Sequence, residues 1–596
     1  MAEAAVDLGK LPEWDLNDLY PGGLNSPQLQ RDLDQVATRA SVFETKFKGK
    51  LAVLSGDDLG SAIAEYEAMQ DILGRVMSFA SLTQAGNVTD SKVGQFYQSV
   101  QERVNGISTS LLFVTLELNR IEDADLEAKY ASAKLAHYCP WLRDVRAFRP
   151  YQLSDEIEKL LHEKSVAGRN AWSRLFDETM AGLRFQLDGK SLTSEQVLHL
   201  LSDKKPATRK AAALSLGKTF GENARLFSLI TNTLAKDKEI EDKWRNLPSP
   251  EAARHLSNAV EPEVVDALVA AVQQAYPRLS HRYYAMKAKW LGGDRLDYWD
   301  RNAPLPEDAD RTIPWPEARD TVLKAYGRFS PKLAEIGQKF FDNAWIDAPS
   351  RPGKSPGAFA HPTVPSAHPY LLLNYQGKTR DVMTLAHELG HGVHQVLAAG
   401  QGTLMSDTPL TLAETASVFG EQLTFRAMLD AAPAARRRIM LASKVEDMLN
   451  TVVRQIAFYT FEQRVHAERR KTELTPERLG EIWLGVQTES LGPALRFDDG
   501  YRAFWCYIPH FIHSPFYVYA YAFGDCLVNA LYVVYANAEQ GFQDKYFTML
   551  KAGGTLRHKE LLAPFGLDAS DPAFWSKGLG VIEGFIDELE RAGSVA

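Results

Sequence analysis

The sequence has few cysteines, no excess of positive charge and no long apolar run. Its three cysteines, Cys139, Cys506 and Cys526, are odd in number and far apart, which excludes a disulfide framework and is typical of a reducing compartment. Lys and Arg number 67 against 76 Asp and Glu, a net charge of −9. Such a protein lacks the positive field that phosphate backbones require, so we expect no nucleic acid partner.

The sequence also shows no segment typical of a membrane-spanning helix or a signal peptide. No stretch approaches the roughly 18 apolar residues of a spanning helix, and even Tyr370–Leu373 is followed at once by Asn374. The opening segment Met1–Asp7 has neither the basic nor the apolar part of a signal peptide. We therefore predict a cytoplasmic protein that has no membrane partner.

What the sequence does contain is helical periodicity. After Pro262, a good first-turn residue, apolar side chains recur three, four and seven positions apart at Val265, Leu268, Val269, Val272 and Tyr276. Comparable patterns cover roughly 57–125, 155–240, 315–345, 410–470 and 515–550. With 596 residues the chain is long enough for more than one lobe, and it is predicted to be mainly α-helical.

Residues 290–377 depart from this pattern because they are rich in proline, glycine and aromatic residues. Short extended segments are predicted at Leu296–Trp299, Gly357–Phe359 and Tyr370–Tyr375, which would form a small β-sheet. A turn at Leu187-Asp188-Gly189-Lys190 favours a boundary near 190. The predicted organisation is an N-terminal helical region, 1–190, and a catalytic region, 191–596.

The motif His387-Glu388-Leu389-Gly390-His391 carries the chemistry. Asp381 is expected to cap its helix. On a helix the two histidines are one turn apart on one face, so both imidazoles can hold one metal ion, while the glutamate between them can reach a metal-bound water. The alternatives are two polar residues on an exposed helix face or satisfied core histidines. Three features disfavour them: the strand, turn and cap before the motif, an available third ligand downstream, and the apolar neighbours Leu385, Ala386, Leu389 and Val393. We predict one zinc ion.

A third ligand is expected downstream. Glu414, in Leu412-Ala413-Glu414-Thr415-Ala416, is the strongest candidate, and Asp407 is a weaker one because it lies in a polar loop beside Pro409. Two histidines and one glutamate leave a position open for water, as a catalytic zinc requires. Glu421 could accept a ring N–H from a ligand histidine, or it could be a surface carboxylate.

These features together resemble oligoendopeptidase F, which belongs with thimet oligopeptidase in one group of zinc metallopeptidases. The likeness rests on the motif, on Glu414 in its Ala-Glu-Thr-Ala-Ser context, and on Ile508-Pro509-His510-Phe511 followed by Pro515–Tyr521. The segment from Trp14 to Pro21 is similar to that family's opening segment. The resemblance implies two helical lobes around a deep channel, with zinc at its floor and a small sheet beside the motif helix, and oligopeptides as substrates.

The resemblance also implies further site residues. Gly357, Ala358 and Phe359 would pair with the substrate backbone. His510 and tyrosines of the C-terminal segment would stabilise the transition state. Tyr517 and Tyr521 share a helical face, whereas Tyr519 points elsewhere if the helix is regular, and all three stay candidates. His513 is expected to serve local structure.

The predicted function is a zinc-dependent endopeptidase that cuts internal bonds of short unfolded peptides, with Glu388 as general base. Two other functions share some of these features. A helical zinc metallocarboxypeptidase would share the motif but release single C-terminal residues. A catalytically silent peptide-binding protein is disfavoured because it needs no base beside the metal.

Overall fold

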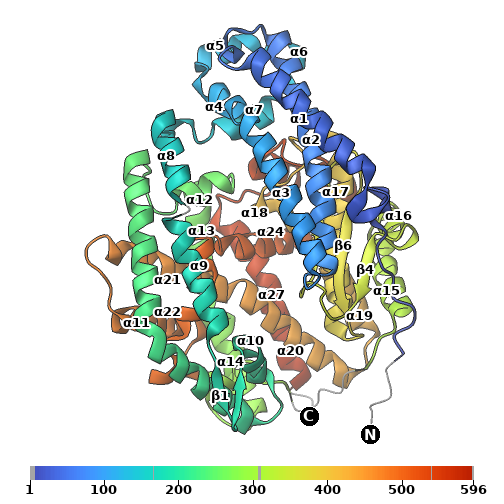
Figure 1. The fold of residues 1–596 in the computed structure, drawn as a ribbon. Helices are drawn as coiled ribbons and strands as arrows, with labels where there is room; N and C mark the ends of the chain where they lie inside the picture. The colour runs from blue at the N-terminus through green and yellow to red at the C-terminus, as the bar shows by residue number, and fades with distance from the viewer. Residues whose placement is uncertain (1–6, 166, 306–310, 538–539, 594–596) are drawn as a thin grey trace. The chain divides into compact units, whose positions relative to one another are not determined.

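Helices make up most of the chain in the computed structural model, which describes residues 7–165, 167–305, 311–537 and 540–593 (Figure 1). Met1–Val6, most of the segment examined for a signal peptide, lie outside the described residues. The mainly α-helical class predicted from the sequence is confirmed.

The chain forms two compact units, and each is built from three separate segments. Unit 1 comprises Met1–Pro150, Asp310–Ala431 and Val534–Leu567. Unit 2 comprises Tyr151–Ala309, Ala432–Val533 and Asp568–Ala596. Neither unit begins at residue 190, and the boundary proposed there stays a prediction.

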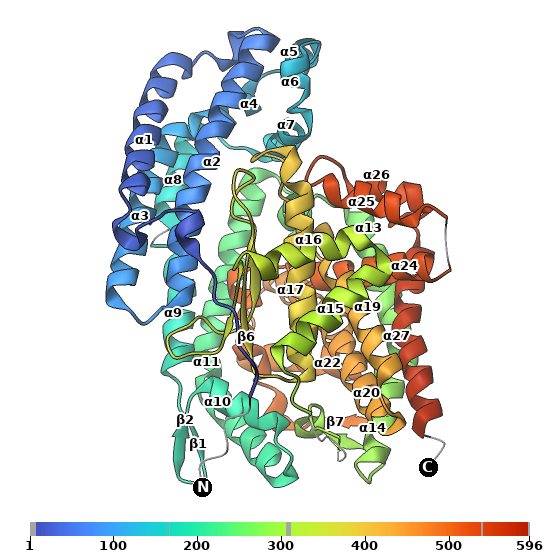
Figure 2. The same ribbon diagram turned by 90° about the vertical axis from the view of Figure 1, so that its right-hand side faces the viewer.

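In unit 1 the N-terminal helices α1, α2 and α3 pack side by side (Figures 1 and 2). Ser26 caps α1 and Pro27 occupies its first turn, so the helix begins where the sequence permits it. The helices of unit 1 are α1 (Pro27–Phe47), α2 (Gly56–Gly86), α3 (Ser91–Leu111), α4 (Phe113–Arg120), α5 (Asp123–Lys129), α6 (Ala133–Ala136), α7 (Cys139–Arg146), α15 (Trp315–Phe329), α16 (Pro331–Asp342), α17 (Thr379–Ala398), α18 (Leu410–Ala413), α19 (Ser417–Ala431), α25 (Phe542–Lys551) and α26 (His558–Leu562).

Unit 2 is organised around the long helix α11, which packs against α9, α21 and α22. The predicted helix after Pro262 is confirmed as α13, and its apolar stripe is buried. The helices of unit 2 are α8 (Asp155–Ser165), α9 (Arg169–Gly182), α10 (Ser194–His199), α11 (Pro206–Arg245), α12 (Ala252–Ser257), α13 (Pro262–Ala275), α14 (Ser280–Trp290), α20 (Ala434–Thr451), α21 (Val453–Arg469), α22 (Pro476–Leu491), α23 (His510–His513), most of α24 (Tyr519–Ala536) and α27 (Pro572–Gly593).

A three-stranded sheet in unit 1 delivers the chain to the motif helix. Its order is β4 (Ile346–Pro349), β6 (Tyr370–Tyr375), β5 (Phe359–His361), with β4 parallel and β5 antiparallel to β6. The predicted strand at 370–375 is confirmed, and the one predicted at Gly357–Phe359 begins two residues later. Gly357 itself adopts φ +80°, which a glycine tolerates and a strand does not use.

Two other pairs of short strands lie in unit 2. The prediction that Leu296–Trp299 belongs to the motif's sheet is wrong, because β3 (Leu296–Asp297) pairs with β7 (Leu495–Arg496). The turn at Asp188-Gly189 joins β1 (Phe185–Leu187) to β2 (Lys190–Leu192), and both turn residues have positive φ, as a tight hairpin requires.

The motif helix α17 begins at Thr379, two residues before the predicted cap. Asp381 lies inside its first turn, where the carboxylate accepts hydrogen bonds from the backbone N–H groups of Gln376 and Lys378. It therefore stabilises the start of the helix from within, and the prediction of Asp381 as the capping residue is wrong by one turn.

Glycines let α17 approach its neighbours closely. A Cβ at Gly390 would lie 2.5 Å from the carbonyl oxygen of Ala416, just before α19, and one at Gly392 would lie 2.6 Å from the ring of Phe340 in α16. Figure 2 shows α15, α16 and α19 beside α17. Tyr326 of α15 adds a hydrogen bond of 2.5 Å from its hydroxyl to the carbonyl of Ala386.

We predict that Gly390→Ala separates α17 from the start of α19. Overpacking of this kind costs about 1–3 kcal/mol of folding free energy, so Tm falls and the protein retains less metal after dialysis. Gly94→Ala in α3 is the matched control, because no atom lies within 4 Å of its added Cβ and alanine favours helix by about 1 kcal/mol. Equal Tm and metal content in Gly390→Ala and wild type would contradict the prediction.

Candidate active site

His387, His391 and Glu414 converge in unit 1. The two imidazole rings lie 4.9 Å apart on one face of α17. Nε2 of His387 is 3.3 Å and Nε2 of His391 is 3.4 Å from the same oxygen of Glu414, Oε2. The three donor atoms lie within 4.8 Å of one another, so one metal ion could contact all of them. Two imidazoles and a carboxylate are a donor set that suits a catalytic zinc.

Glu414 is presented by the short segment between α18 and α19. It follows the last residue of α18, and the hydroxyl of Ser417 at the start of α19 donates a 2.7 Å hydrogen bond to its Oε2. The hydroxyl of Tyr546 donates to the carbonyl of the next residue, Thr415, at 2.9 Å. The carboxylate is thus fixed by the same packing that joins α17 to α19.

His394 of α17 supports this segment and was not among the site residues predicted from the sequence. Its side chain is 5% exposed and bonds to the backbone carbonyl of Ala413, next to Glu414. Its Nε2 lies 3.4 Å from the hydroxyl of Thr408. Burial lowers the pKa of His394 to about 4, so the ring is neutral. The signal in the sequence was a further histidine one turn after His391 on the same helix.

Three acidic side chains set the electrostatics of the site. Burial lowers the pKa of His387, but the Glu421 hydrogen bond and the Glu414 and Glu388 charges outweigh it and bring the value to about 9. Burial raises the pKa of Glu414, but its hydrogen bond with His391 and nearby imidazole charges bring it to about 2. These carboxylates favour positive charge at the site, which a bound divalent metal would supply.

Glu421 lies where a partner for a ligand histidine was expected. Its Oε2 is 3.3 Å from Nδ1 of His387, the ring nitrogen that faces away from Glu414. Its position fits the role of orienting the ring through a hydrogen bond. Asp407 does not belong to the ligand cluster of the described residues, which leaves Glu414 as the carboxylate that meets both histidines.

Glu388 is buried beside the ligands without joining them. Its side chain is 8% exposed, and its carboxylate accepts a hydrogen bond from the backbone N–H of Ala360 in β5. Burial raises its pKa, and the charges of His387 and His391 partly offset this. A carboxylate with a raised pKa, held between a metal site and an edge strand, is suited to general base chemistry.

The predicted C-terminal residues form a cluster within unit 2. Nε2 of His510 lies 3.3 Å from the hydroxyl of Tyr521. The ring of Tyr517 is nearly parallel to that of His510 at 6.1 Å and meets the ring of Tyr521 at 5.2 Å. The structure therefore brings His510, Tyr517 and Tyr521 together.

Tyr519 faces a different environment. Its side chain is fully buried, and its hydroxyl accepts a 2.9 Å hydrogen bond from the amide of Asn258 and lies 3.1 Å from Nδ1 of His255. His513, expected to be structural, has its Nε2 2.8 Å from the carboxylate of Asp177. These contacts tie both side chains to unit 2.

The turn that presents this cluster is held by buried polar groups. Phe516 has a positive φ of 59°, and its N–H donates a 2.8 Å hydrogen bond to the buried carboxyl of Glu462. The guanidinium of Arg254 donates to the carbonyl of Pro515 at 3.2 Å and lies over the ring of Tyr517. An uncommon backbone conformation fixed in this way fits a functional turn.

The predicted substrate-pairing segment lies at the end of the sheet. Gly357 and Ala358 precede β5, and Phe359 is its first residue. The carbonyl of Gly357 accepts a 2.9 Å hydrogen bond from the side chain of Asn374 in β6. Among the described residues β5 pairs only with β6, so no strand covers its other edge, where Ala360 contacts Glu388 and Gln395 of α17.

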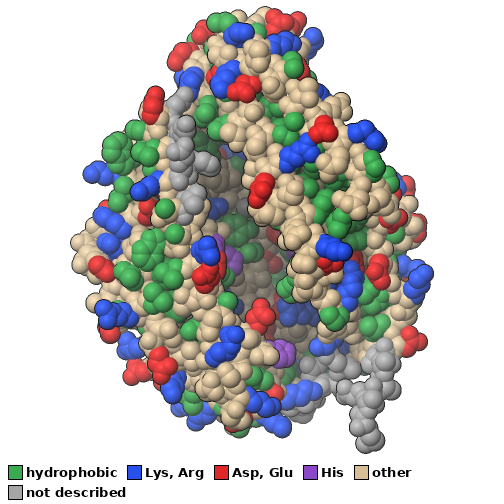
Figure 3. Space-filling view, viewed as in Figure 1, with side chains coloured by type: hydrophobic (Ala, Val, Ile, Leu, Met, Phe, Trp, Pro, Cys, Tyr) green, Lys and Arg blue, Asp and Glu red, His purple; other side chains and the backbone are tan. Residues whose placement is uncertain are grey.

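The surface in Figure 3 mixes Lys and Arg with Asp and Glu, with no continuous basic patch on the face shown. The absence of a nucleic acid partner stays a prediction. Within the described ranges, no helix combines the length and the apolar character needed to cross a bilayer.

Two family profiles match the sequence of this chain. The sequence profile of peptidase family M3 matches residues 199–581, and that of oligopeptidase F matches residues 117–185. The chain belongs to peptidase family M3. The predicted resemblance is thereby confirmed, and so is the enzyme class, a metalloendopeptidase.

Individual relatives are similar to this chain over nearly its whole length. Oligopeptidase PepF of Bacillus subtilis is 27% identical over 593 residues, covering 97% of this chain and 87% of the relative. An oligoendopeptidase F homologue of Borreliella burgdorferi is 23% identical, covering 98% of this chain and 99% of its own. The crystal structure of oligoendopeptidase F from Enterococcus faecium has a similar fold, with a TM-score of 0.69 at 21% identity over 95% of this chain and 99% of that one.

Proposed function

We propose that this protein is a zinc-dependent oligoendopeptidase that hydrolyses internal bonds of short unfolded peptides. The observation that carries the proposal is the joint placement of His387, His391, Glu414 and Glu388 beside the open edge of β5. Family membership supports peptide hydrolysis, and the names of the relatives support oligopeptides as the substrate class. A cytoplasmic location stays a prediction.

Zinc is the metal that the donor set favours, with His387, His391 and Glu414 as its ligands. When bound, zinc supplies an acidified water and polarises the peptide carbonyl. Glu421 keeps the ring of His387 oriented through Nδ1, so that Nε2 stays directed at the metal position.

Glu388 accepts a proton from the attacking water and passes it to the nitrogen of the leaving amine. Its raised pKa moves the carboxyl towards the pH at which it can do both. The hydrogen bond from Ala360 holds the carboxylate at the edge of β5, where a substrate backbone would lie.

The open edge of β5 is the proposed substrate platform. Ala360 directs its N–H to Glu388 and its carbonyl towards the side chain of Gln395, 3.5 Å away, so both groups face away from β6. Backbone groups two residues apart point to the same edge, which leaves those of Ala358 for an added peptide strand. Gly357 and Phe359 flank this position.

His510, Tyr517 and Tyr521 are proposed to donate hydrogen bonds to the oxyanion of the transition state. Support comes from the family's pattern and from their clustering in unit 2. Burial lowers the pKa of His510, which keeps the ring neutral with one N–H to donate. Tyr519 is left out of this set because its hydroxyl is bonded to Asn258.

Glu388→Gln tests the general base. The amide cannot accept the proton, so kcat should fall by about 10²–10⁴ while the metal content stays that of wild type. Metal analysis and hydrolysis of a quenched fluorescent peptide are measured together. Glu335→Gln, an exposed change on α16, is the control. A fully metallated Glu388→Gln with wild-type kcat would exclude the assignment.

Phenylalanine substitutions separate the three tyrosines. Tyr517→Phe and Tyr521→Phe should each lower kcat, by up to about 10²–10³ if the lost hydroxyl binds the oxyanion, with little change in Tm. Tyr519→Phe should instead lower Tm, because a buried partner loses its hydrogen bond at a cost of about 1–3 kcal/mol, and should leave kcat intact. The reverse pattern would move the catalytic role to Tyr519.

A further inference from the structure

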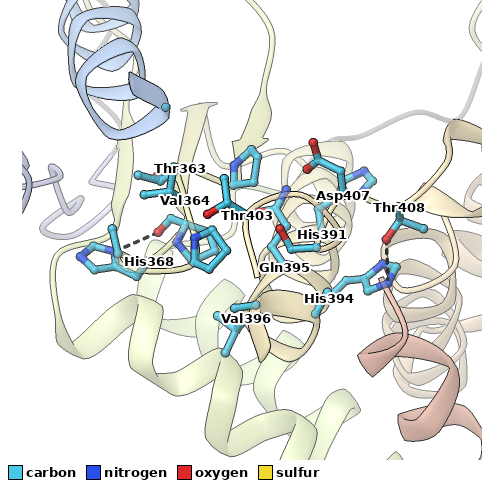
Figure 4. Close-up of a pocket in the computed structure, with 18 of the residues that line it drawn as sticks. Thr363, Val364, His368, His391, His394, Gln395, Val396, Thr403, Asp407 and Thr408 are labelled. Atoms are coloured by element: carbon cyan, nitrogen blue, oxygen red, sulfur yellow. Dashed lines mark hydrogen bonds between the residues drawn. The ribbon is translucent and has the colours of Figure 1, made fainter. Parts of the chain in front are cut away.

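A cavity of about 640 Å³ opens in unit 1 beside the metal ligands. His391 forms part of its wall, together with residues of α2, the second half of α17, and the loops that follow β5 and precede α18. Figure 4 shows Thr363, Val364 and His368 on one side of it, and His391, His394, Asp407 and Thr408 on the other. A peptide side chain placed near the reacting carbonyl could therefore enter it.

Asp407 is the acidic side chain of this wall. It is exposed, and it makes no hydrogen bond or ion pair with any residue in the described part of the chain. It also stands outside the metal ligand group, so the metal does not account for it. A carboxylate that lines a cavity without a partner is suited to bind a cation from a ligand.

Other polar atoms of the cavity wall also lack partners. Thr363 Oγ1 and Gln395 Oε1 are buried and have no hydrogen-bond partner among the described residues. Both can accept hydrogen bonds. Thr363 adopts a φ of +63°, an uncommon conformation for a β-branched residue. Both oxygens lie behind the accessible surface of the wall, so they make its interior polar without reaching a ligand in the cavity.

Lys339 is the lysine of the same cavity wall. Burial against the wall raises the pKa of Asp407, and no charged group contributes to that shift. Lys339 therefore does not neutralise the carboxylate.

We propose that this cavity is a specificity subsite in which Asp407 binds a positively charged group of the peptide, a Lys or Arg side chain or the α-ammonium, at one fixed position relative to the cleaved bond. The proposal rests on the proposed peptidase function. The subsite gives the enzyme a preference for peptides with a basic group, which the metal centre itself does not impose.

The test compares peptides that differ in one charge. Each pair carries arginine or its neutral isostere citrulline at one of the positions around the cleaved bond, with a free or an acetylated N-terminus, and kcat/KM is measured for the metal-loaded enzyme. At one position wild type should prefer arginine by about 10- to 100-fold, as expected for a charge-assisted hydrogen bond. The preference should weaken as salt is added, because the carboxylate is exposed.

Two substitutions make the result specific to Asp407. In Asp407→Asn the arginine-to-citrulline ratio should fall to about 1, and Asp407→Lys should prefer glutamate over glutamine at the same position. Glu335→Gln, which removes an equal charge on α16, should keep the wild-type ratio. If the bound cation is the side chain, the arginine preference persists after acetylation. If it is the α-ammonium, arginine and citrulline peptides are cleaved equally, the free N-terminus is preferred over the acetylated one, and Asp407→Asn loses that preference.

Either of two results would overturn the proposal: wild type prefers neither arginine at any position nor a free N-terminus, or Asp407→Asn keeps the wild-type preference. The effect of Asp407→Asn is measured as the ratio of two kcat/KM values in one enzyme preparation. Partial loss of folded protein lowers both values equally and leaves the ratio unchanged. Failure of the proposed function itself would look different, because metal-loaded wild type would then cleave none of the peptides.

Discussion

The close approach of α17 to the start of α19 is the constraint on which the site depends. Gly390 has no side chain at the point where the backbone of Ala416 and Ser417 passes, and any larger residue would push the two helices apart. That approach carries Glu414 to the two histidines and Glu421 to the outer nitrogen of His387. The proposed metal site therefore depends on the glycine inside the motif as well as on its candidate ligands.

The same packing explains why so many charged groups lie together in a poorly solvated place. Each carboxylate has an imidazole within reach, and the Glu414 oxygen that faces both histidines is also bonded to Ser417. Buried charges are tolerated when they are paired or hold a metal. Glu388 differs from these carboxylates, because it accepts a hydrogen bond from a backbone N–H and stands outside the group that could hold a metal. This position fits its proposed role in proton transfer.

Sequence patterns predicted those features that are determined by the spacing of residues close together along the chain. The i, i+4 histidines, the apolar stripe of α13 and the strand at Tyr370–Tyr375 needed only periodicity. Glu414 was the leading candidate for the third ligand, on its context and its distance along the chain, and the fold brings it to the histidines.

What the patterns missed depends on contacts between distant residues. Strand β4 was hidden by Asp347 and Pro349, and a fully buried aspartate is possible there because Arg351 and Lys354 both reach its carboxylate. The bonds of Tyr519 to Asn258, and of His394 to the segment before Glu414, likewise join residues that no local pattern relates.

We propose that the packing of α17 on α19 creates one metal site with His387, His391 and Glu414 as its protein ligands. Anomalous diffraction from zinc-loaded crystals, recorded on both sides of the zinc edge, tests it directly. We expect one strong peak about 2.0–2.2 Å from Nε2 of each histidine and from a carboxylate oxygen of Glu414, with Glu388 outside the coordination sphere. A peak coordinated by Asp407 or Glu388 in place of Glu414, or no peak at α17, would contradict it.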